Sequence, residues 1–238
     1  MNGLRTYLAK WDISLNEEQI RQFQRYYDLL AEWNSFMNLT AITEKNEVIL
    51  KHFTDSLALM HFMQLQEQSL IDLGSGAGFP GIPLKIANPG LKITLVDSLQ
   101  KRIRFLDTVI LELGLSGITT VCSRAEDLAR DPKFREAFDL CTSRAVANLA
   151  TLSEYSLPFV KTGGFFVPYK SEKTETELEE ASYAIRLLGG HTDEVISYLL
   201  PDSDLKRTLL LIRKNANTPA KFPRRAGTPS KDPIHQTQ

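Results

Sequence analysis

Apolar residues recur at helical spacing along the first sixty residues of the chain. The pattern predicts a short helix over residues 2–11 and a second helix ending near Asn34. Ser14 and Glu17 form the Ser-x-x-Glu pattern of a capping box, which predicts the start of that second helix. A third helix is predicted over residues 47–62. The aromatic residues on the apolar sides of these helices indicate core packing rather than base stacking.

From Leu70 onward, short apolar runs alternate with amphipathic segments. Strands are predicted over 70–73, 92–97, 118–122, 138–143 and 164–169, with helices over 79–87, 99–113, 126–130, 149–160 and 171–188. Two further strands, 192–199 and 207–213, have no helix between them and predict an antiparallel hairpin. The sequence therefore predicts an α/β fold with a doubly wound, mostly parallel, seven-stranded Rossmann-like sheet and a helical N-terminal extension.

Three parts of the chain follow from this pattern. We predict a helical segment over 1–66 packed on the core, a main α/β domain over 67–214, and a basic C-terminal arm over 215–238. The arm is rich in proline, lysine and arginine, so we expect it to be extended and mobile. From Lys206 onward the sequence has eight lysines and arginines against the single acid Asp232. A basic arm beside a site is typical of RNA contact, with Arg224 and Arg225 as candidates, although a solvated tail is the simpler alternative.

Composition limits the other possibilities. The 238 residues carry a net charge of −1, so nucleic-acid contact must come from local patches rather than from the whole chain. Cys122 and Cys141 lie in apolar strand-like runs, which favours two buried thiols, and no metal-ligand spacing is present. No apolar run reaches membrane-spanning length, so we expect a cytoplasmic protein, and nothing requires more than a monomer.

The richest chemistry lies where the first strand ends. Asp72 is followed by glycines at 74, 76, 78 and 81, which predict a turn whose backbone N–H groups can approach a ligand closely. Residues 76–81 match the dinucleotide pattern Gly-x-Gly-x-x-Gly, and residues 72–78 match the acid-x-Gly-x-Gly-x-Gly pattern of S-adenosylmethionine sites. Asp97, at the end of the second strand, can reach the ribose of either ligand. The closing hairpin favours S-adenosylmethionine, because it is typical of methyltransferase sheets.

Two later strand ends add candidate residues. Ala125 and Glu126 follow the third strand, where an adenine ring would lie, although they also suit a helix start with acids at its positive end. Arg144 follows the fourth strand, opposite the glycine turn. The Asn/Asp-Pro-Pro-aromatic sequence of adenine amino-methyltransferases is absent, and Cys141 is mid-strand and so poorly placed as a nucleophile. A fixed cation suits an acceptor that is already nucleophilic, such as guanine N7, with no general base; a surface ion pair is the alternative.

The chain resembles the bacterial glucose-inhibited division protein B family, which methylates guanine N7 in small-subunit ribosomal RNA. The resemblance rests on Trp33-Asn34, Asn38-Leu39-Thr40, Lys51-His52 with Asp55-Ser56, Asp72 to Gly81, Arg124-Ala125-Glu126, Ser143-Arg144-Ala145 and Arg224-Arg225-x-Gly-Thr-Pro. It implies cofactor contacts at Gly74, Phe79, Ala125, Glu126 and Arg144. It also implies that Asn34, Asn38, His52 and Asp55 approach the RNA, although His52 suits a packing role equally well.

These expectations combine into one hypothesis with two rivals. The favoured function is S-adenosylmethionine-dependent methyl transfer to N7 of one guanosine in 16S ribosomal RNA, with the RNA or a ribosomal particle as partner. The cofactor-binding candidates are Asp72, Gly74, Gly76, Gly78, Phe79, Asp97, Ala125, Glu126 and Arg144. The alternatives are an NAD(P)-dependent oxidoreductase and a non-catalytic RNA-binding protein that kept the fold.

Overall fold

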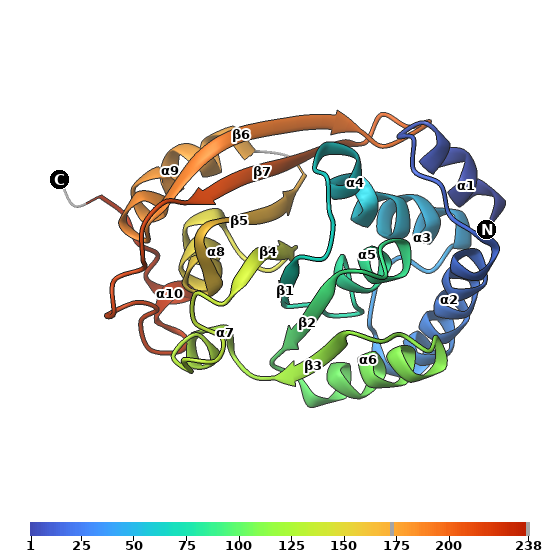
Figure 1. Ribbon diagram of the computed structural model, residues 1–238, viewed down its shortest axis with the longest axis horizontal. Coiled ribbons are helices and arrows are strands. Elements are labelled where there is room, and N and C mark those ends of the chain that lie inside the picture. The colour runs from blue at the N-terminus through green and yellow to red at the C-terminus, as the bar shows by residue number, and fades with distance from the viewer. Residues whose placement is uncertain (172–173, 237–238) are drawn as a thin grey trace.

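The chain folds around one seven-stranded sheet (Figure 1). The computed structural model describes residues 1–171 and 174–236. The strands are β1 (Ser69–Leu73), β2 (Lys92–Asp97), β3 (Ile118–Cys122), β4 (Phe138–Arg144), β5 (Val160–Lys170), β6 (Gly190–Leu199) and β7 (Lys206–Lys214). Their spatial order is β3-β2-β1-β4-β5-β7-β6. Strands β1 to β5 are parallel, and β7 runs antiparallel to both β5 and β6, which confirms the predicted sheet and hairpin.

The helices follow the predicted alternation. They are α1 (Asn2–Ala9), α2 (Glu17–Met37), α3 (Lys45–Val48), α4 (Asp55–Phe62), α5 (Gly81–Ala87), α6 (Gln100–Glu112), α7 (Ala125–Leu128), α8 (Leu149–Ser156), α9 (Thr174–Leu187) and α10 (Thr228–Lys231). A π-helical stretch, η1 (Ile49–Thr54), joins α3 to α4, and a 3-10 turn, η2 (Leu157–Phe159), precedes β5. The predicted helix over 171–188 and the predicted arm over 215–238 each include two residues that lie outside the described ones.

Strand residues alternate between two apolar layers. Leu70 and Leu140 face the layer that contains α1 to α6, whereas Ile71 and Cys141 face the layer that contains α8 and α9. This alternation follows from the two-residue period of a strand, and burial on both faces explains the nearly continuous apolar runs. The N-terminal helical segment shares its core with the sheet, as Figure 1 shows on the side of α5 and α6. The domain limits at 66/67 and 214/215 stay predictions.

Three local predictions were wrong. The capping box of α2 is made by Asn16 and Gln19, not by Ser14 and Glu17: Gln19 N donates to Asn16 Oδ1 at 2.9 Å and Asn16 N donates to Gln19 Oε1 at 2.8 Å. The side-chain amide of Gln19 can both accept and donate, and its Nε2 also donates a hydrogen bond to the carbonyl of Ile86. The predicted 149–160 helix ends at Ser156, and Val160 already begins β5; the predicted 47–62 helix does form, with the π-helical stretch η1 inside it. Cys122 is exposed rather than buried, because β3 is an edge strand.

The C-terminal arm was also wrongly predicted to be extended and mobile. Phe222 and Ile234 are buried in the layer beside α8 and α9. Arg135 donates hydrogen bonds to the carbonyls of Thr218 and Phe222, and Arg130 donates to that of Pro223. The composition suggested disorder, but two buried apolar side chains and the hydrogen bonds from Arg130 and Arg135 keep the segment on the surface of the fold.

Order in the sheet reverses between β1 and β4. The chain leaves β1 toward β2 and β3 on one side and later returns to place β4 and β5 on the other. Crevices for ligands open at such a switch point, outside the carboxyl ends of the strands. Among the described residues, no helix combines the length and the apolar character needed to cross a membrane.

Candidate active site

Two adjoining cavities open at the carboxyl ends of the central strands. The first, the glycine-turn cavity, has a volume of about 320 Å³ and lies at the ends of β1, β2 and β3. The second, the Arg144 cavity, has a volume of about 290 Å³ and lies between the end of β4 and the helical segment. Ala145 and Leu152 line both cavities. The two cavities therefore adjoin at this shared wall, so a group bound in one lies close to the other.

Asp97 ties the glycine turn to the neighbouring strand. Its Oδ2 accepts hydrogen bonds from Gly76 N at 3.0 Å and from Arg102 Nη1 at 3.2 Å, and its Oδ1 accepts one from Leu99 N at 2.9 Å. The side chain lines the glycine-turn cavity, as the sequence predicted for an acid at the end of the second strand. The carboxylate is held in place before any ligand binds.

Asp72 lies beneath the turn rather than among the described residues that line the two cavities. Its Oδ2 accepts a hydrogen bond from Gly81 N at 3.0 Å, and Thr142 Oγ1 donates to its Oδ1 at 3.3 Å. Burial raises the pKa of this carboxyl to about 6, against the opposing effects of the Gly81 hydrogen bond and of Arg144. Asp72 therefore shapes the turn from below, and its direct contact with a cofactor remains only a prediction.

Gly74 and Gly78 of the turn have positive φ angles, which residues with a side chain rarely adopt. Gly74 has a φ of +68°, and a Cβ there would lie 2.6 Å from Cγ2 of Val146. Gly78 has a φ of +97°, and a Cβ there would meet Ile82 at 2.6 Å and the hydroxyl of Tyr26 at 2.8 Å. Gly74 lines the glycine-turn cavity, whereas Gly78 allows helix α2 to approach the turn. The motif thus serves both ligand access and packing.

Ala125 and Glu126 line the far end of the glycine-turn cavity. Glu126 is 4% exposed, and its Oε1 accepts a hydrogen bond from Gly227 N at 2.8 Å. The C-terminal segment thus positions a carboxylate that the sequence had assigned to adenine. Asp97 and the apolar side chains of Val146 and Leu152 line the same cavity, so the residues present fit an adenosine-type ligand.

Arg144, the last residue of β4, lines the Arg144 cavity but not the glycine-turn cavity. Its guanidinium donates to the carbonyl of Lys51 and to Asp55 Oδ2, both at 3.3 Å, and its Cζ lies 5.0 Å from the centre of the Phe79 ring. Three kinds of contact therefore restrict this cation to one position. The surface ion pair considered from the sequence is replaced by a largely buried one.

His52 is held as a neutral imidazole. Its Nδ1 lies 3.2 Å from Arg144 Nη2; an arginine can only donate, so Nδ1 is the acceptor and Nε2 carries the proton. That proton points to Thr40 Oγ1 at 2.8 Å. Burial, followed by the charge of Arg144, lowers the pKa of His52 from 6.5 to about 3. The ring also stacks on Phe79 with centroids 4.5 Å apart.

The π-helical stretch explains how neighbouring residues reach the site together. Within η1, His52 contacts Arg144 through its side chain while Lys51 does so through its carbonyl oxygen. A π-helix widens the spacing of successive hydrogen bonds and is common at functional sites. Asp55 follows directly at the start of α4, where it is 4% exposed and accepts from the hydroxyl of Tyr198 at 3.1 Å.

Replacing His52 by glutamine should change how the stability of the protein depends on pH. The folded pKa of His52 lies below its unfolded value, so the wild type loses stability as pH falls below about 6.5, because the unfolded chain binds the extra proton. The raised pKa of Asp72 gives both proteins the opposite slope between its ordinary value and about 6. We therefore expect the unfolding free energy of wild type minus that of His52→Gln to fall by about 2 kcal/mol between roughly pH 7 and pH 5.

Urea unfolding at several pH values would measure this difference. His191→Gln, at an exposed residue of β6, is the control for the loss of one imidazole. A difference that stays constant with pH would show that His52 is not buried as a neutral ring.

The other predicted RNA contacts lie farther from this cavity. Asn34 holds a loop: its Nδ2 donates to the carbonyl of Thr40 at 3.0 Å, and its Oδ1 accepts from Thr40 N at 2.9 Å. Asn38 ends α2 with a φ of 51° and is exposed. Asn34 therefore orients Thr40, which in turn contacts His52. Neither Asn34 nor Asn38 lines the Arg144 cavity, and a contact of either residue with RNA stays a prediction.

Arg224 and Arg225 differ from each other. Arg224 donates from its backbone N at 2.7 Å and its Nη2 at 2.8 Å to the fully buried carboxylate of Glu154, and it also contacts Asp232. Arg225 is exposed. The structure thus assigns Arg224 a packing role that the charge pattern did not reveal, and leaves only Arg225 of the pair with an accessible charge.

Sequence analysis missed several residues that line the Arg144 cavity. Lys170 and Ser171 lie at the end of β5, and Arg207 comes from the antiparallel strand β7. The rule that sites form at the carboxyl ends of parallel strands could have identified Lys170 and Ser171. Arg207 gave no such signal, because its position at the cavity depends on the register of the closing hairpin. Among the described residues, no group of histidine, cysteine, aspartate or glutamate side chains could hold a metal ion.

Comparisons with known proteins agree with this geometry. Residues 19–206 match the family model GidB, described as rRNA small subunit methyltransferase G. A protein named ribosomal RNA small subunit methyltransferase G from Lachnoclostridium phytofermentans is 55% identical over 228 residues, which cover 95% of this chain and 94% of the relative. The protein of the same name from Lactobacillus johnsonii is 52% identical and covers 95% of this chain and 96% of its own length.

Solved structures share the fold at low sequence identity. A chain in the complex of the Haloferax volcanii Trm112 methyltransferase activator with a methyltransferase matches with a TM-score of 0.58, at 16% identity, over 79% of this chain and 98% of its own. The YcgJ protein of Bacillus subtilis matches with a TM-score of 0.52, at 16% identity, over 68% of this chain and 99% of its own. At this sequence identity the similarities show a shared fold alone.

Proposed function

This chain belongs to the rRNA small subunit methyltransferase G family, and we propose that it transfers a methyl group to N7 of one guanosine in 16S ribosomal RNA. The resemblance found in the sequence motifs is thereby confirmed. The observation that supports the reaction best is the shared wall of the two cavities, in which Ala145 and Leu152 take part in both. Family membership favours methyl transfer over the NAD(P)-dependent oxidoreductase considered from the sequence.

The glycine-turn cavity would hold S-adenosylmethionine, which supplies an electrophilic methyl group when bound. Asp97 would accept hydrogen bonds from ribose hydroxyls, and Ala125 and Glu126 would lie against the adenine ring. The backbone at Gly74 would pass close to the amino-acid end, because no Cβ stands there. Each of these groups is already held by hydrogen bonds or packing, so binding costs little ordering of the protein.

The Arg144 cavity would hold the target guanine. The guanidinium of Arg144 is fixed by Asp55, Lys51 and Phe79, so it can orient the base toward the shared wall. Guanine N7 already has an in-plane lone pair and needs no deprotonation. His52 agrees with this, since its Nδ1 is occupied by Arg144 and cannot take a proton from the substrate. Alignment of the reacting atoms then supplies catalysis, up to about 10 kcal/mol.

The partner follows from the substrate. We propose that the protein acts in the cytoplasm, as a monomer, on small-subunit ribosomal RNA or on a particle that contains it. Arg225 would contribute a sequence-independent phosphate contact. The test is to map N7-methylguanosine in small-subunit RNA from cells that lack the protein and after adding the purified protein with S-adenosylmethionine. Absence of a protein-dependent mark would contradict the proposal.

Gly74→Ala should separate cofactor binding from folding. The new Cβ would lie 2.6 Å from Val146 Cγ2 and push that side chain, which lines the glycine-turn cavity. We expect S-adenosylmethionine to bind about tenfold more weakly, equivalent to roughly 1.4 kcal/mol, and the RNA mark to decline with it. Calorimetric titration would measure the affinity.

Gly114→Ala is the matched control for Gly74→Ala. Gly114 has a similar φ of +61°, but a Cβ there would meet nothing within 4 Å. The control should therefore carry the same backbone strain without changing cofactor affinity. Equal losses in the two variants would attribute the effect to strain rather than to the cavity.

A further inference from the structure

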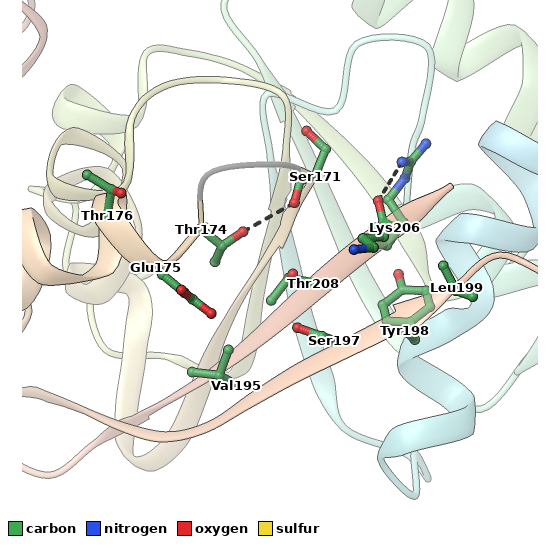
Figure 2. A pocket seen from close by; sticks show the side chains of 11 residues that line it. Ser171, Thr174, Glu175, Thr176, Val195, Ser197, Tyr198, Leu199, Lys206 and Thr208 are labelled. Atoms are coloured by element: carbon green, nitrogen blue, oxygen red, sulfur yellow. Dashed lines mark hydrogen bonds between the residues drawn. The ribbon is translucent and has the colours of Figure 1, made fainter. Parts of the chain in front are cut away.

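A groove of about 660 Å³ lies outside the two cavities already described (Figure 2). Its floor is the exposed face of the β6–β7 ribbon, and its wall is the beginning of α9. On the floor, Ser197 pairs with Thr208 and Leu199 pairs with Lys206 across the two strands. The reaction described above assigns no role to this groove.

The groove floor is exposed because of the strand period. Ile196 and Tyr198 of β6 turn toward the core formed by the helical segment, so Val195, Ser197 and Leu199 turn outward. The side chains of Val195 and Leu199 are 43% and 51% exposed. An outward face that combines apolar side chains, hydroxyls and a lysine differs from an ordinary solvated face, which is mainly charged.

The groove continues into the Arg144 cavity. Ser171 and Arg207 line both spaces. The Nε of Arg207 lies 3.5 Å from Asp55 Oδ2, and Asp55 is also the partner of Arg144. A polymer whose target nucleotide occupies the Arg144 cavity must continue beyond that cavity, and the groove adjoins it at Ser171 and Arg207.

We propose that this groove binds the single-stranded RNA segment next to the target nucleotide, an inference that rests on the proposed function. Lys206 would contact a phosphate, and the hydroxyl of Ser197 would contact the sugar–phosphate backbone; both residues are exposed. Val195 and Leu199 provide apolar surface for an unstacked base. The carboxylate of Glu175 on the wall repels phosphate but accepts hydrogen bonds from a base amino group or a ribose 2′-hydroxyl.

Charge reversal at the groove provides the first test. Lys206→Glu should weaken binding of small-subunit RNA about tenfold at roughly 0.1 M salt and should reduce the salt dependence of log K by about one. Lys92→Glu makes the same change at an exposed residue that begins β2, at the end of the strand opposite to the carboxyl ends where the cavities lie, and should not alter RNA binding. Equal RNA affinities for the two variants would overturn the proposal.

Crosslinking identifies what lies in the groove. Ser197→Cys, in a Cys122→Ser background because Cys122 is exposed, would carry a photoactivated crosslinker into the groove floor. With small-subunit particles as substrate, a crosslink to RNA beside the methylated guanosine is expected. Ser182→Cys, at an exposed residue of α9, is the positional control. Crosslinks to a ribosomal protein alone, or none above this control, would overturn the proposal.

Different results would contradict the proposed function and the groove proposal. If the wild-type protein neither binds S-adenosylmethionine nor marks RNA, the proposed function is wrong. If the wild type marks RNA and Lys206→Glu does so with unchanged RNA affinity, only the groove proposal is wrong. Titration of S-adenosylmethionine into Lys206→Glu should give the wild-type affinity, because Lys206 does not line the glycine-turn cavity.

Discussion

Arg144→Ala is expected to methylate ribosomal RNA at least about 100-fold more slowly than the wild type while retaining its affinity for S-adenosylmethionine. The guanidinium lines the Arg144 cavity but not the glycine-turn cavity, so its loss removes a group that orients the acceptor. A displacement of the acceptor by about 1 Å is sufficient for a rate loss of this size. Single-turnover methylation and calorimetry measure the two quantities separately.

Stability should change much less in this variant. Asp55 keeps two partners when Arg144 is removed, Arg207 Nε at 3.5 Å and Tyr198 Oη at 3.1 Å, so its buried carboxylate is not left alone. We expect the free energy of unfolding to fall by about 2 kcal/mol. Arg144→Lys keeps the charge but cannot donate to Asp55 and His52 in one plane, so it should recover stability more fully than rate.

Two outcomes would contradict this interpretation of Arg144. If the unfolding free energy collapses along with activity, Arg144 is a structural residue. If the cofactor affinity falls as far as the rate does, Arg144 acts on the cofactor rather than on the acceptor. Arg25→Ala, which removes an exposed ion pair with Glu112, is the control for losing an arginine from the surface.

Arg224→Ala is expected to lower the free energy of unfolding by about 3–5 kcal/mol. Glu154 is fully buried, and the guanidinium of Arg224 bonds to both of its oxygens, through Nε at 3.0 and 3.1 Å and through Nη2 at 2.8 Å. Without the guanidinium, the carboxylate of Glu154 would keep only the backbone N–H at position 224 as a partner from this segment. Removing one member of a buried ion pair leaves an uncompensated charge, which is the costly case.

Arg225→Ala provides a matched control in the next residue. The side chain of Arg225 is exposed, so its removal should change stability by no more than about 0.5 kcal/mol. Urea denaturation compares the two variants directly. A loss of under about 1 kcal/mol in Arg224→Ala would show that the Arg224–Glu154 pair does not hold the C-terminal segment.

Arg224→Ala should also weaken the binding of S-adenosylmethionine. The segment that Arg224 anchors includes Gly227, whose N–H bonds to Glu126 in the glycine-turn cavity. Thr151 of α8 donates to the carbonyl of Pro229 at 2.9 Å, so the segment also braces the helix that carries Leu152. Weaker binding of S-adenosylmethionine in Arg224→Ala would follow from the loss of this support.

The sheet and its order of connections were largely predictable from local pattern. Apolar runs of strand length, a glycine turn after Asp72 and two closing strands without a helix between them lead to one topology, because parallel strands need crossovers and hairpin strands do not. The positions of Asp97 and Arg144 followed from the same rule, since both end parallel strands. These features can be inferred from the residue pattern within each segment, although the strand pairing itself joins residues as far apart as Leu70 and Leu140.

Contacts between distant parts of the chain were not predictable in this way. Composition predicted a free basic arm. In the structure Arg224 of this arm pairs with the buried carboxylate of Glu154, and Phe222 and Ile234 are buried in the apolar core. Periodicity does not distinguish Asn16 from Ser14 as the cap of α2, and the contact of Gln19 with the carbonyl of Ile86 in α5 appears only in the folded chain.

By itself, the sequence determined the fold class, the glycine turn and the acids and arginine at the strand ends, because each depends on short-range steric and periodic rules. Only the tertiary structure decided that His52 is neutral, that Glu126 is held by Gly227, and that Arg207 joins the Arg144 cavity to a groove on β6 and β7. Burial and the register of distant segments set these properties, and both arise only when the whole chain packs together.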